Sequence, residues 1–181
     1  MNGWQVALIR GINVGKAKRV AMADLRAMLA DFGYGDVKTL LNSGNAVFTT
    51  QDAPGGAAAR IEEGLATRLG VPARVVVLTG EEVAALVADN PLREIATDPS
   101  RYLVAVLADP ADRRLLEPLT ERDWGADALA LGERVAYLWC AGGILESRLS
   151  EAVGRALRDG VTSRNWATML KLHALVGGGA G

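Results

Sequence analysis

The stretch VKTLLNSGNAVFTT, residues 37–50, decides the fold of this chain. Val37–Leu41 and Ala46–Thr50 are short runs rich in apolar and β-branched residues, which favour strands. Asn42–Asn45 separate the two runs, and asparagine, serine and glycine are residue types that suit tight turns. The stretch therefore predicts a β-hairpin with a polar turn.

The flanking segments extend this hairpin to a larger unit. Upstream, Trp4–Ile9 is an apolar run typical of a buried strand, and apolar residues at helical spacing over residues 25–32 predict a helix that ends at Gly33. Downstream, a second apolar stripe predicts a helix within residues 52–70, and Val75–Leu78 is a β-branched strand. The resulting order, βαββαβ, is the ferredoxin-like arrangement.

A similar pattern restarts in the second half of the chain. Thr79 and Glu82 have the spacing of a capping box at the start of a short helix, and residues 97–100 resemble a linker. Strands are then expected at Tyr102–Leu107, Ala128–Leu131 and Val135–Trp139, with one helix after the first strand and another after the third. This second unit has the order βαββα.

We therefore expect an α/β (α+β) fold with two related units. The predicted segments are a ferredoxin-like unit at residues 1–79, a helix and linker at 80–101, a second α/β unit with a C-terminal helix at 102–176, and a disordered tail at 177–181.

Composition narrows the classes of protein to which the chain can belong. The formal net charge is −1, but Lys and Arg outnumber Asp and Glu in residues 1–50 and 151–181, whereas the middle is acidic. A single cysteine, Cys140, excludes an internal disulfide framework and fits a reducing compartment. Without a secretory signal pattern or an apolar run of membrane-spanning length, we expect a cytoplasmic protein with no membrane partner.

The predicted strand order brings two polar loops together. In a ferredoxin-like sheet the third strand lies between the first two and runs opposite to both. The segment after Ile9 and the turn at Asn42–Asn45 should therefore share one edge. The connection from Arg10 to the helix near Met22 is also long for such a unit, and long connections often carry function.

This long connection resembles a phosphate-binding P-loop only loosely. Its glycines, Gly11 and Gly15, stand closer together than that motif requires, and Ala17 replaces the hydroxyl residue that would hold magnesium. Backbone N–H groups and several cations can still hold an anion. The alternative is a solvated loop whose glycines serve only its turns. The basic residues are Arg10, Lys16, Lys18 and Arg19.

The rest of the chain adds few chemical groups. Ser43 has no nearby histidine to activate it, His173 and Cys140 fit core positions, and no cluster predicts a metal or a cofactor. Residues 162–166 are expected to open the last helix, where a helix N-terminus beside an arginine can attract an anion. The candidate ligand-binding residues are Arg10, Asn13, Lys16, Asn42, Ser43, Asn45, Arg164 and Asn165.

Three ordered motifs, ALIRGINVGKAKRVAMADLRAML, LLNSGNAVF and VTSRNWATMLKL, resemble the bacterial domain-of-unknown-function family 1697 over nearly the whole chain. The resemblance implies an α/β, ferredoxin-like architecture and no established activity. Lys16 and Asn42 depart from residues common in the family, a glycine and a glutamine. The positions that match the family's motifs are Arg10, Gly11, Asn13, Gly15, Asn42, Ser43, Gly44, Asn45, Ser163, Arg164, Asn165 and Trp166.

Three hypotheses about function follow from the sequence. The first is a protein that binds a small anionic or nucleotide-like ligand at the basic edge, with Arg164 and Asn165 completing the site. The second is a single-stranded nucleic-acid-binding module, which the scarcity of aromatic residues disfavours. The third is a regulatory module that binds a partner without catalysis. No set of residues identifies a nucleophile, a base or a metal, so the sequence does not decide whether the protein is an enzyme.

Overall fold

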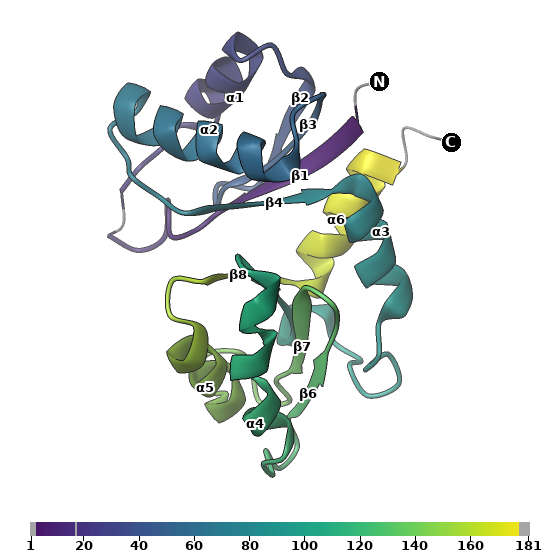
Figure 1. Ribbon diagram of the computed structural model, residues 1–181. Coiled ribbons are helices and arrows are strands. Elements are labelled where there is room, and N and C mark those ends of the chain that lie inside the picture. Colours follow the sequence, from purple (N-terminus) through teal and green to yellow (C-terminus); the bar gives the residue numbers. More distant parts are fainter. Residues whose placement is uncertain (1–2, 17, 178–181) are drawn as a thin grey trace. The chain divides into compact units, whose positions relative to one another are not determined.

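The computed structural model describes residues 3–16 and 18–177 of the chain (Figure 1). These residues form two compact units: unit 1 comprises the described residues up to Ala84 and from Leu172 onward, and unit 2 comprises Ala85–Lys171. Each contains helices and a four-stranded antiparallel sheet, which confirms the predicted mixed α/β class. Within the described residues, no helix is both long and apolar enough to cross a membrane.

The elements of the first half, in chain order, are β1 (Gly3–Ile9), α1 (Met22–Asp31), β2 (Gly35–Leu40), β3 (Asn45–Thr50), α2 (Pro54–Arg68), β4 (Val75–Thr79) and α3 (Gly80–Asp89). Those of the second half are the 3₁₀ helix η1 (Pro99–Arg101), β5 (Tyr102–Leu107), the 3₁₀ helix η2 (Pro110–Leu115), α4 (Glu117–Thr120), β6 (Ala128–Leu131), β7 (Val135–Trp139), α5 (Arg148–Leu157), β8 (Val161–Asn165) and α6 (Trp166–Gly177). Gly177 of the tail predicted as disordered belongs to α6, and the rest of that tail lies outside the described residues.

Unit 1 has the strand order β2-β3-β1-β4, with every neighbouring pair antiparallel. The predicted hairpin of β2 and β3 is confirmed, and β3 pairs with β1 from Gly3 opposite Thr50 to Leu8 opposite Asn45. All residues of β3 are buried, so the sheet is covered on both faces. This order places the segment after β1 beside the turn between β2 and β3.

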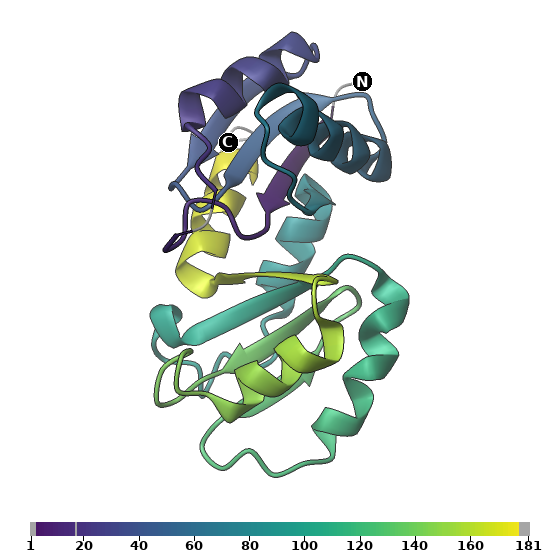
Figure 2. The same cartoon turned by 90° about the vertical axis from the view of Figure 1, so that its left-hand side faces the viewer.

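Helices α1 and α2 cover one face of this sheet and share one apolar core with it (Figures 1 and 2). Leu29 of α1 and Ile61 of α2 are fully buried, and burial of such a side chain stabilises the fold by about 2 kcal/mol. Gly64 permits the close approach of the helices, because a Cβ atom there would lie 2.7 Å from the sulfur of Met28. Because β1 and α1 both contribute residues to this core, the two ends of the polar segment between them are held in place.

Unit 2 has the strand order β6-β7-β5-β8 and ends in a strand that the sequence did not predict. Residues 161–165 form β8 rather than the first turn of the last helix, and they pair with β5, with Leu103 opposite Asn165. The unit is therefore βαββαβ rather than βαββα. Helix α6 begins only at Trp166, where the side-chain oxygen of Asn165 accepts a hydrogen bond from the Thr168 amide (2.9 Å).

The sheet of unit 2 is also buried on both faces. Its apolar residues form one core with α5 and the segment from η2 to α4, and the curved ribbon of α5 crosses that face in Figure 2. On the other face Tyr102 packs against Tyr137 and Trp166, at ring-centroid distances of 6.2 Å and 5.0 Å. The Tyr137 hydroxyl donates a hydrogen bond to the Leu86 carbonyl of α3 (2.7 Å), which satisfies a buried polar group.

The two units repeat one pattern of backbone hydrogen bonds where their first strand ends. In each unit, the last residue of the first strand donates to the turn before the third strand, and the next residue donates to the segment just before the fourth strand. These bonds are Ile9 N to Gly44 O (2.8 Å) and Arg10 N to Arg74 O (2.9 Å) in unit 1, and Leu107 N to Arg134 O (3.0 Å) and Ala108 N to Gly160 O (2.9 Å) in unit 2.

Equivalent frameworks carry very different connections after the first strand. In unit 2, only residues 108–109 separate β5 from η2. In unit 1, residues 10–21 separate β1 from α1. We call residues 10–21 the basic loop; its Ala17 lies outside the described residues. Unit 2 therefore shows that a sheet with this strand order can form with a much shorter connection after its first strand.

Candidate functional site

Asn13 organises the basic loop through its side-chain amide. Its oxygen accepts a hydrogen bond from the Val20 amide (2.8 Å), and its Nδ2 donates to the Val20 carbonyl (2.8 Å). The backbone N–H of Asn13 donates to the Lys18 carbonyl (3.1 Å). Asn13 has φ +56°, a left-handed conformation that asparagine tolerates better than most residues. These bonds join Asn13 to Lys18 and Val20, near the two ends of the loop.

The basic loop and the hairpin turn meet, as the strand order predicted. Nδ2 of Asn13 also donates to the Asn42 carbonyl, at 2.8 Å. Ile12, only 1% exposed, packs beneath Gly44, whose φ is +96°. A Cβ atom at Gly44 would lie 2.9 Å from Cβ of Ile9 and 3.0 Å from Cδ1 of Ile12, so only glycine fits without displacement. We call the paired basic loop and residues 41–45 the rim.

The side chain of Asn45 stabilises the hairpin turn through hydrogen bonds inside the turn. It is fully buried at the start of β3, and its Nδ2 donates to the Leu40 carbonyl (2.8 Å) and to the Ser43 hydroxyl oxygen (3.1 Å). Asn13 and Asn45 were both predicted to contact a ligand. In the structure the amide of Asn13 bonds within the basic loop and to the hairpin turn, whereas the amide of Asn45 bonds within the turn. We therefore assign them a bracing role. A ligand contact by either residue stays a prediction.

The exposed part of the basic loop carries cations. Lys16, Lys18 and Arg19 are exposed, and residues 10–21 contain no carboxylate. Arg19 donates from Nη2 to the Gly15 carbonyl (3.0 Å), which holds its side chain along the loop. Neither lysine forms an ion pair with the described part of the chain. The loop therefore presents positive charge to solvent without a built-in counter-charge.

Arg10 and Ser43 are less exposed than the lysines. The guanidinium Nε of Arg10 is buried, and no group in residues 3–16 and 18–177 accepts a hydrogen bond from it. A buried donor without a partner costs about 1–3 kcal/mol, so such a group favours an acceptor from outside the protein. Ser43 is half-buried and its oxygen is engaged by Asn45. The side chain of Asn42 is exposed, and its carbonyl serves the contact with Asn13.

Arg164 and Asn165 belong to unit 2, in β8. Arg164 is half-buried and donates from Nη1 to the Ser163 carbonyl (2.9 Å). Burial lowers the pKa of Arg164 to about 10, which still leaves the guanidinium protonated at neutral pH. Asn165 caps α6, as described above. The contribution of these two residues to the rim stays a prediction.

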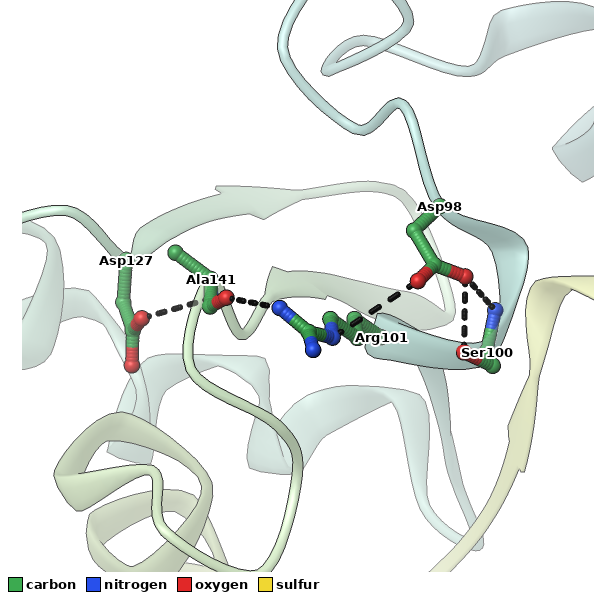
Figure 3. Close-up of polar contacts among 5 residues, drawn as sticks. All are labelled: Asp98, Ser100, Arg101, Asp127 and Ala141. Carbon is green, nitrogen blue, oxygen red and sulfur yellow. Dashed lines mark hydrogen bonds and ion pairs between the residues drawn. The ribbon is translucent and has the colours of Figure 1, made fainter.

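Sequence reasoning did not find a polar network at the end of the unit 2 sheet (Figure 3). Arg101 donates to the Ala141 carbonyl (2.7 Å) and pairs with Asp98 (3.6 Å), and the carboxylate of Asp127 accepts from the Ala141 amide (2.9 Å). Asp127 also accepts from the hydroxyl of Ser147, the N-cap of α5, at 2.8 Å. The network fixes the loop between β7 and α5, and all its members bond to each other or to backbone.

A second unpredicted cluster lies in unit 1 around Tyr34. Its hydroxyl donates to the Asp52 carboxylate (2.8 Å), its ring stacks on Phe48 at 4.7 Å, and Arg60 lies 3.5 Å from the same carboxylate. Burial, followed by the hydrogen bond to Asp52, raises the pKa of Tyr34 to about 12. A phenol held neutral in this way is a poor base or nucleophile at neutral pH. We interpret the cluster as a structural contact that joins the sheet to α2.

Within the described residues no group of His, Cys, Asp and Glu could hold a metal ion.

Comparisons with known proteins agree with the family resemblance. The protein-of-unknown-function family DUF1697 matches residues 3–137. The solved structure of conserved bacterial protein SP0830 from Streptococcus pneumoniae is similar, with a TM-score of 0.76 at 20% sequence identity, covering 97% of this chain and 99% of that one. At that identity the likeness supports the fold alone. No curated protein matches the chain. Because the family match extends over well more than half of its length, the chain belongs to the DUF1697 family of proteins of unknown function.

Proposed function

We propose that the rim binds a small anionic ligand, of the phosphate-bearing or nucleotide-like kind. One observation carries the proposal: the basic loop is long and braced where the equivalent connection of unit 2 consists of residues 108–109. The fold of unit 2 does without such a loop. A segment that is internally fixed, exposed and cationic is better explained by what it binds than by what it stabilises.

The loop offers the chemical groups that an anion needs. Lys16 and Lys18 are exposed, and Arg10 holds a guanidinium N–H without an acceptor in the described part of the chain. Gly11 and Gly15 have φ of +69° and +54°, and turns of this kind can direct backbone N–H groups to one side. Charge-assisted hydrogen bonds to phosphate are about twice as strong as neutral ones. The bracing by Asn13 reduces the entropy that binding would cost.

Single-stranded nucleic acid is a weaker candidate for the same surface. Proteins that bind single strands stack bases on aromatic side chains, and each stacked base contributes roughly 1–3 kcal/mol. Residues 10–21 and 41–45 contain no aromatic residue. The rim can thus attract phosphates but lacks the platforms that hold consecutive bases, which favours a small ligand.

Titration of the full-length protein with inorganic pyrophosphate and with ADP by isothermal calorimetry tests this proposal. We expect binding that weakens as salt rises, because the contacts are exposed charges. Replacement of Lys16 or Lys18 by alanine should weaken binding by roughly fivefold each, the equivalent of about 1 kcal/mol for an exposed ion pair.

Lys171→Ala is the matched control, because Lys171 is also exposed but lies on α6, far along the chain from the rim. It removes the same charge and should leave the affinity unchanged. If neither pyrophosphate nor ADP binds, or if the Lys171 variant loses as much affinity as the loop variants, the rim is not the anion site.

A further inference from the structure

We infer that the anion bound at the rim is part of an organic molecule, whose apolar portion packs on Leu41 and Val14. The inference rests on the proposed function and narrows its phosphate-bearing or nucleotide-like ligands to phosphate esters with an apolar body. It comes from two aliphatic side chains that the anion itself does not require.

Leu41 is an unexpected residue at its position. It begins the hairpin turn with φ +60°, in the left-handed region, and its side chain is 52% exposed. For most residues with a Cβ atom this conformation is strained, whereas glycine and asparagine adopt it readily. A half-exposed leucine offsets little of that strain through burial. Leu41 therefore opposes the stability of the turn that it belongs to, and strained residues of this kind cluster at binding sites.

Val14 presents the second aliphatic surface on the other half of the rim. Its side chain is 53% exposed, although it lies in the loop that Asn13 braces. The two residues are connected by the hydrogen bond from Asn13 Nδ2 to the Asn42 carbonyl, since Val14 follows Asn13 and Leu41 precedes Asn42. Lys16 lies two positions beyond Val14 in the same loop. Exposed apolar and cationic side chains thus belong to the same rim.

Exposed aliphatic side chains beside exposed cations suit a ligand that has both an apolar part and an anionic part. A bare inorganic phosphate would gain from the lysines and gain nothing from exposed aliphatic groups. A phosphate ester with a flat or apolar body would bury part of Leu41 and Val14 while its charge meets Lys16. Nucleoside phosphates have this construction, because one face of the base can lie on aliphatic side chains. We therefore use ADP as the probe and inorganic pyrophosphate, which carries the same two phosphates, as its reference.

The test compares the affinities for ADP and pyrophosphate in the parent protein and in Leu41→Asn. We expect the parent to bind ADP about tenfold more tightly than pyrophosphate, which corresponds to burying roughly 50 Å² of apolar surface. In Leu41→Asn the affinity for ADP should fall toward that for pyrophosphate, while the affinity for pyrophosphate stays the same. Asparagine relieves the strain at φ +60°, so the variant should be at least as stable as the parent in thermal unfolding.

Leu145→Asn is the matched control, because Leu145 is 98% exposed in unit 2 and should not affect either affinity. Equal binding of ADP and pyrophosphate by the parent would overturn this inference and leave the proposed anion site standing. Failure of both probes to bind would remove the proposed function and this inference together. Association with phosphatidylglycerol vesicles without any ADP binding would also overturn it, because the aliphatic groups would then serve a lipid surface.

Discussion

Replacement of Asn13 by glycine should destabilise unit 1 and release the basic loop. The substitution removes three side-chain hydrogen bonds, to Val20 N, Val20 O and Asn42 O, all at 2.8 Å. Each such bond contributes about 1 kcal/mol net, so the expected loss is about 2–3 kcal/mol once water has satisfied the freed carbonyls. Glycine accepts φ +56° without strain, so the loss reports the hydrogen bonds together with the greater backbone freedom of glycine in the unfolded chain. Asn13→Ala should cost roughly 1 kcal/mol more, because alanine is strained there.

Urea unfolding followed by far-UV circular dichroism measures this change. With a slope of roughly 2 kcal/mol/M, the midpoint of Asn13→Gly should fall by about 1 M. Amide hydrogen exchange at Val20 gives a local readout, since its N–H donates to Asn13 and should lose protection. Asn42→Ala is the control, because Asn42 contributes its carbonyl rather than its exposed side chain. If the Asn13→Gly midpoint and the Val20 exchange rate both match those of the parent, Asn13 does not brace the loop.

Two further results are expected. Gly44→Ala should destabilise the protein by about 2–4 kcal/mol in urea unfolding. The added Cβ atom would stand at φ +96° and lie 2.9 Å from Ile9 and 3.0 Å from Ile12. A loss below about 1 kcal/mol would contradict that geometry. Tyr34 should make stability sensitive to alkaline pH: the folded state raises its pKa from 10.0 to about 12, so its contribution is fully present below pH 10 and is lost as the pH rises through about 12. Tyr34→Phe should flatten this part of the stability profile, and absorbance of the tyrosinate ion should show one late-titrating tyrosine fewer.

The sequence predicted those parts of the fold whose signals are local. The hairpin of β2 and β3 was predictable because Asn42–Asn45 carry turn chemistry between two β-branched runs. The capping box was predictable because its hydrogen bonds involve only Thr79 and Glu82, which are three positions apart. Each side chain accepts a hydrogen bond at 3.0 Å from the other residue's backbone amide. In these cases the interacting residues lie close in sequence, so the spacing of residue types contains the information.

Strand β8 was missed because its signal is not local. Ser163, Arg164 and Asn165 are polar, and before an apolar helix they look like a cap and a first turn. Their conformation is set instead by backbone bonds to β5, whose residues lie far away in the sequence. Polar residues are tolerated in this strand because it lies at the edge of its sheet, where β5 is its one neighbour.

For the candidate site, the sequence predicted that the two loops meet but not which groups their side chains bond. The strand order was enough to bring the basic loop beside the hairpin turn. It could not show that Asn13 and Asn45 turn their amides inward, because that depends on which carbonyls lie within about 3 Å in the folded chain. Nor could it show the conformation of Leu41. Asparagine is typical of both ligand contacts and turn braces, and the distinction lies in burial.

Comparison between the units separates what the fold requires from what the rim adds. Both units place the same two backbone bonds after their first strand, so those bonds belong to the framework. Asn13, Gly44 and Asn45 of unit 1 extend that framework to hold a loop that unit 2 lacks. A family member that kept these three residues but lost Lys16 and Lys18 would retain the braced loop without its charge. The braces should therefore govern stability and the exposed side chains should govern binding, so variants of the two groups should affect different measurements.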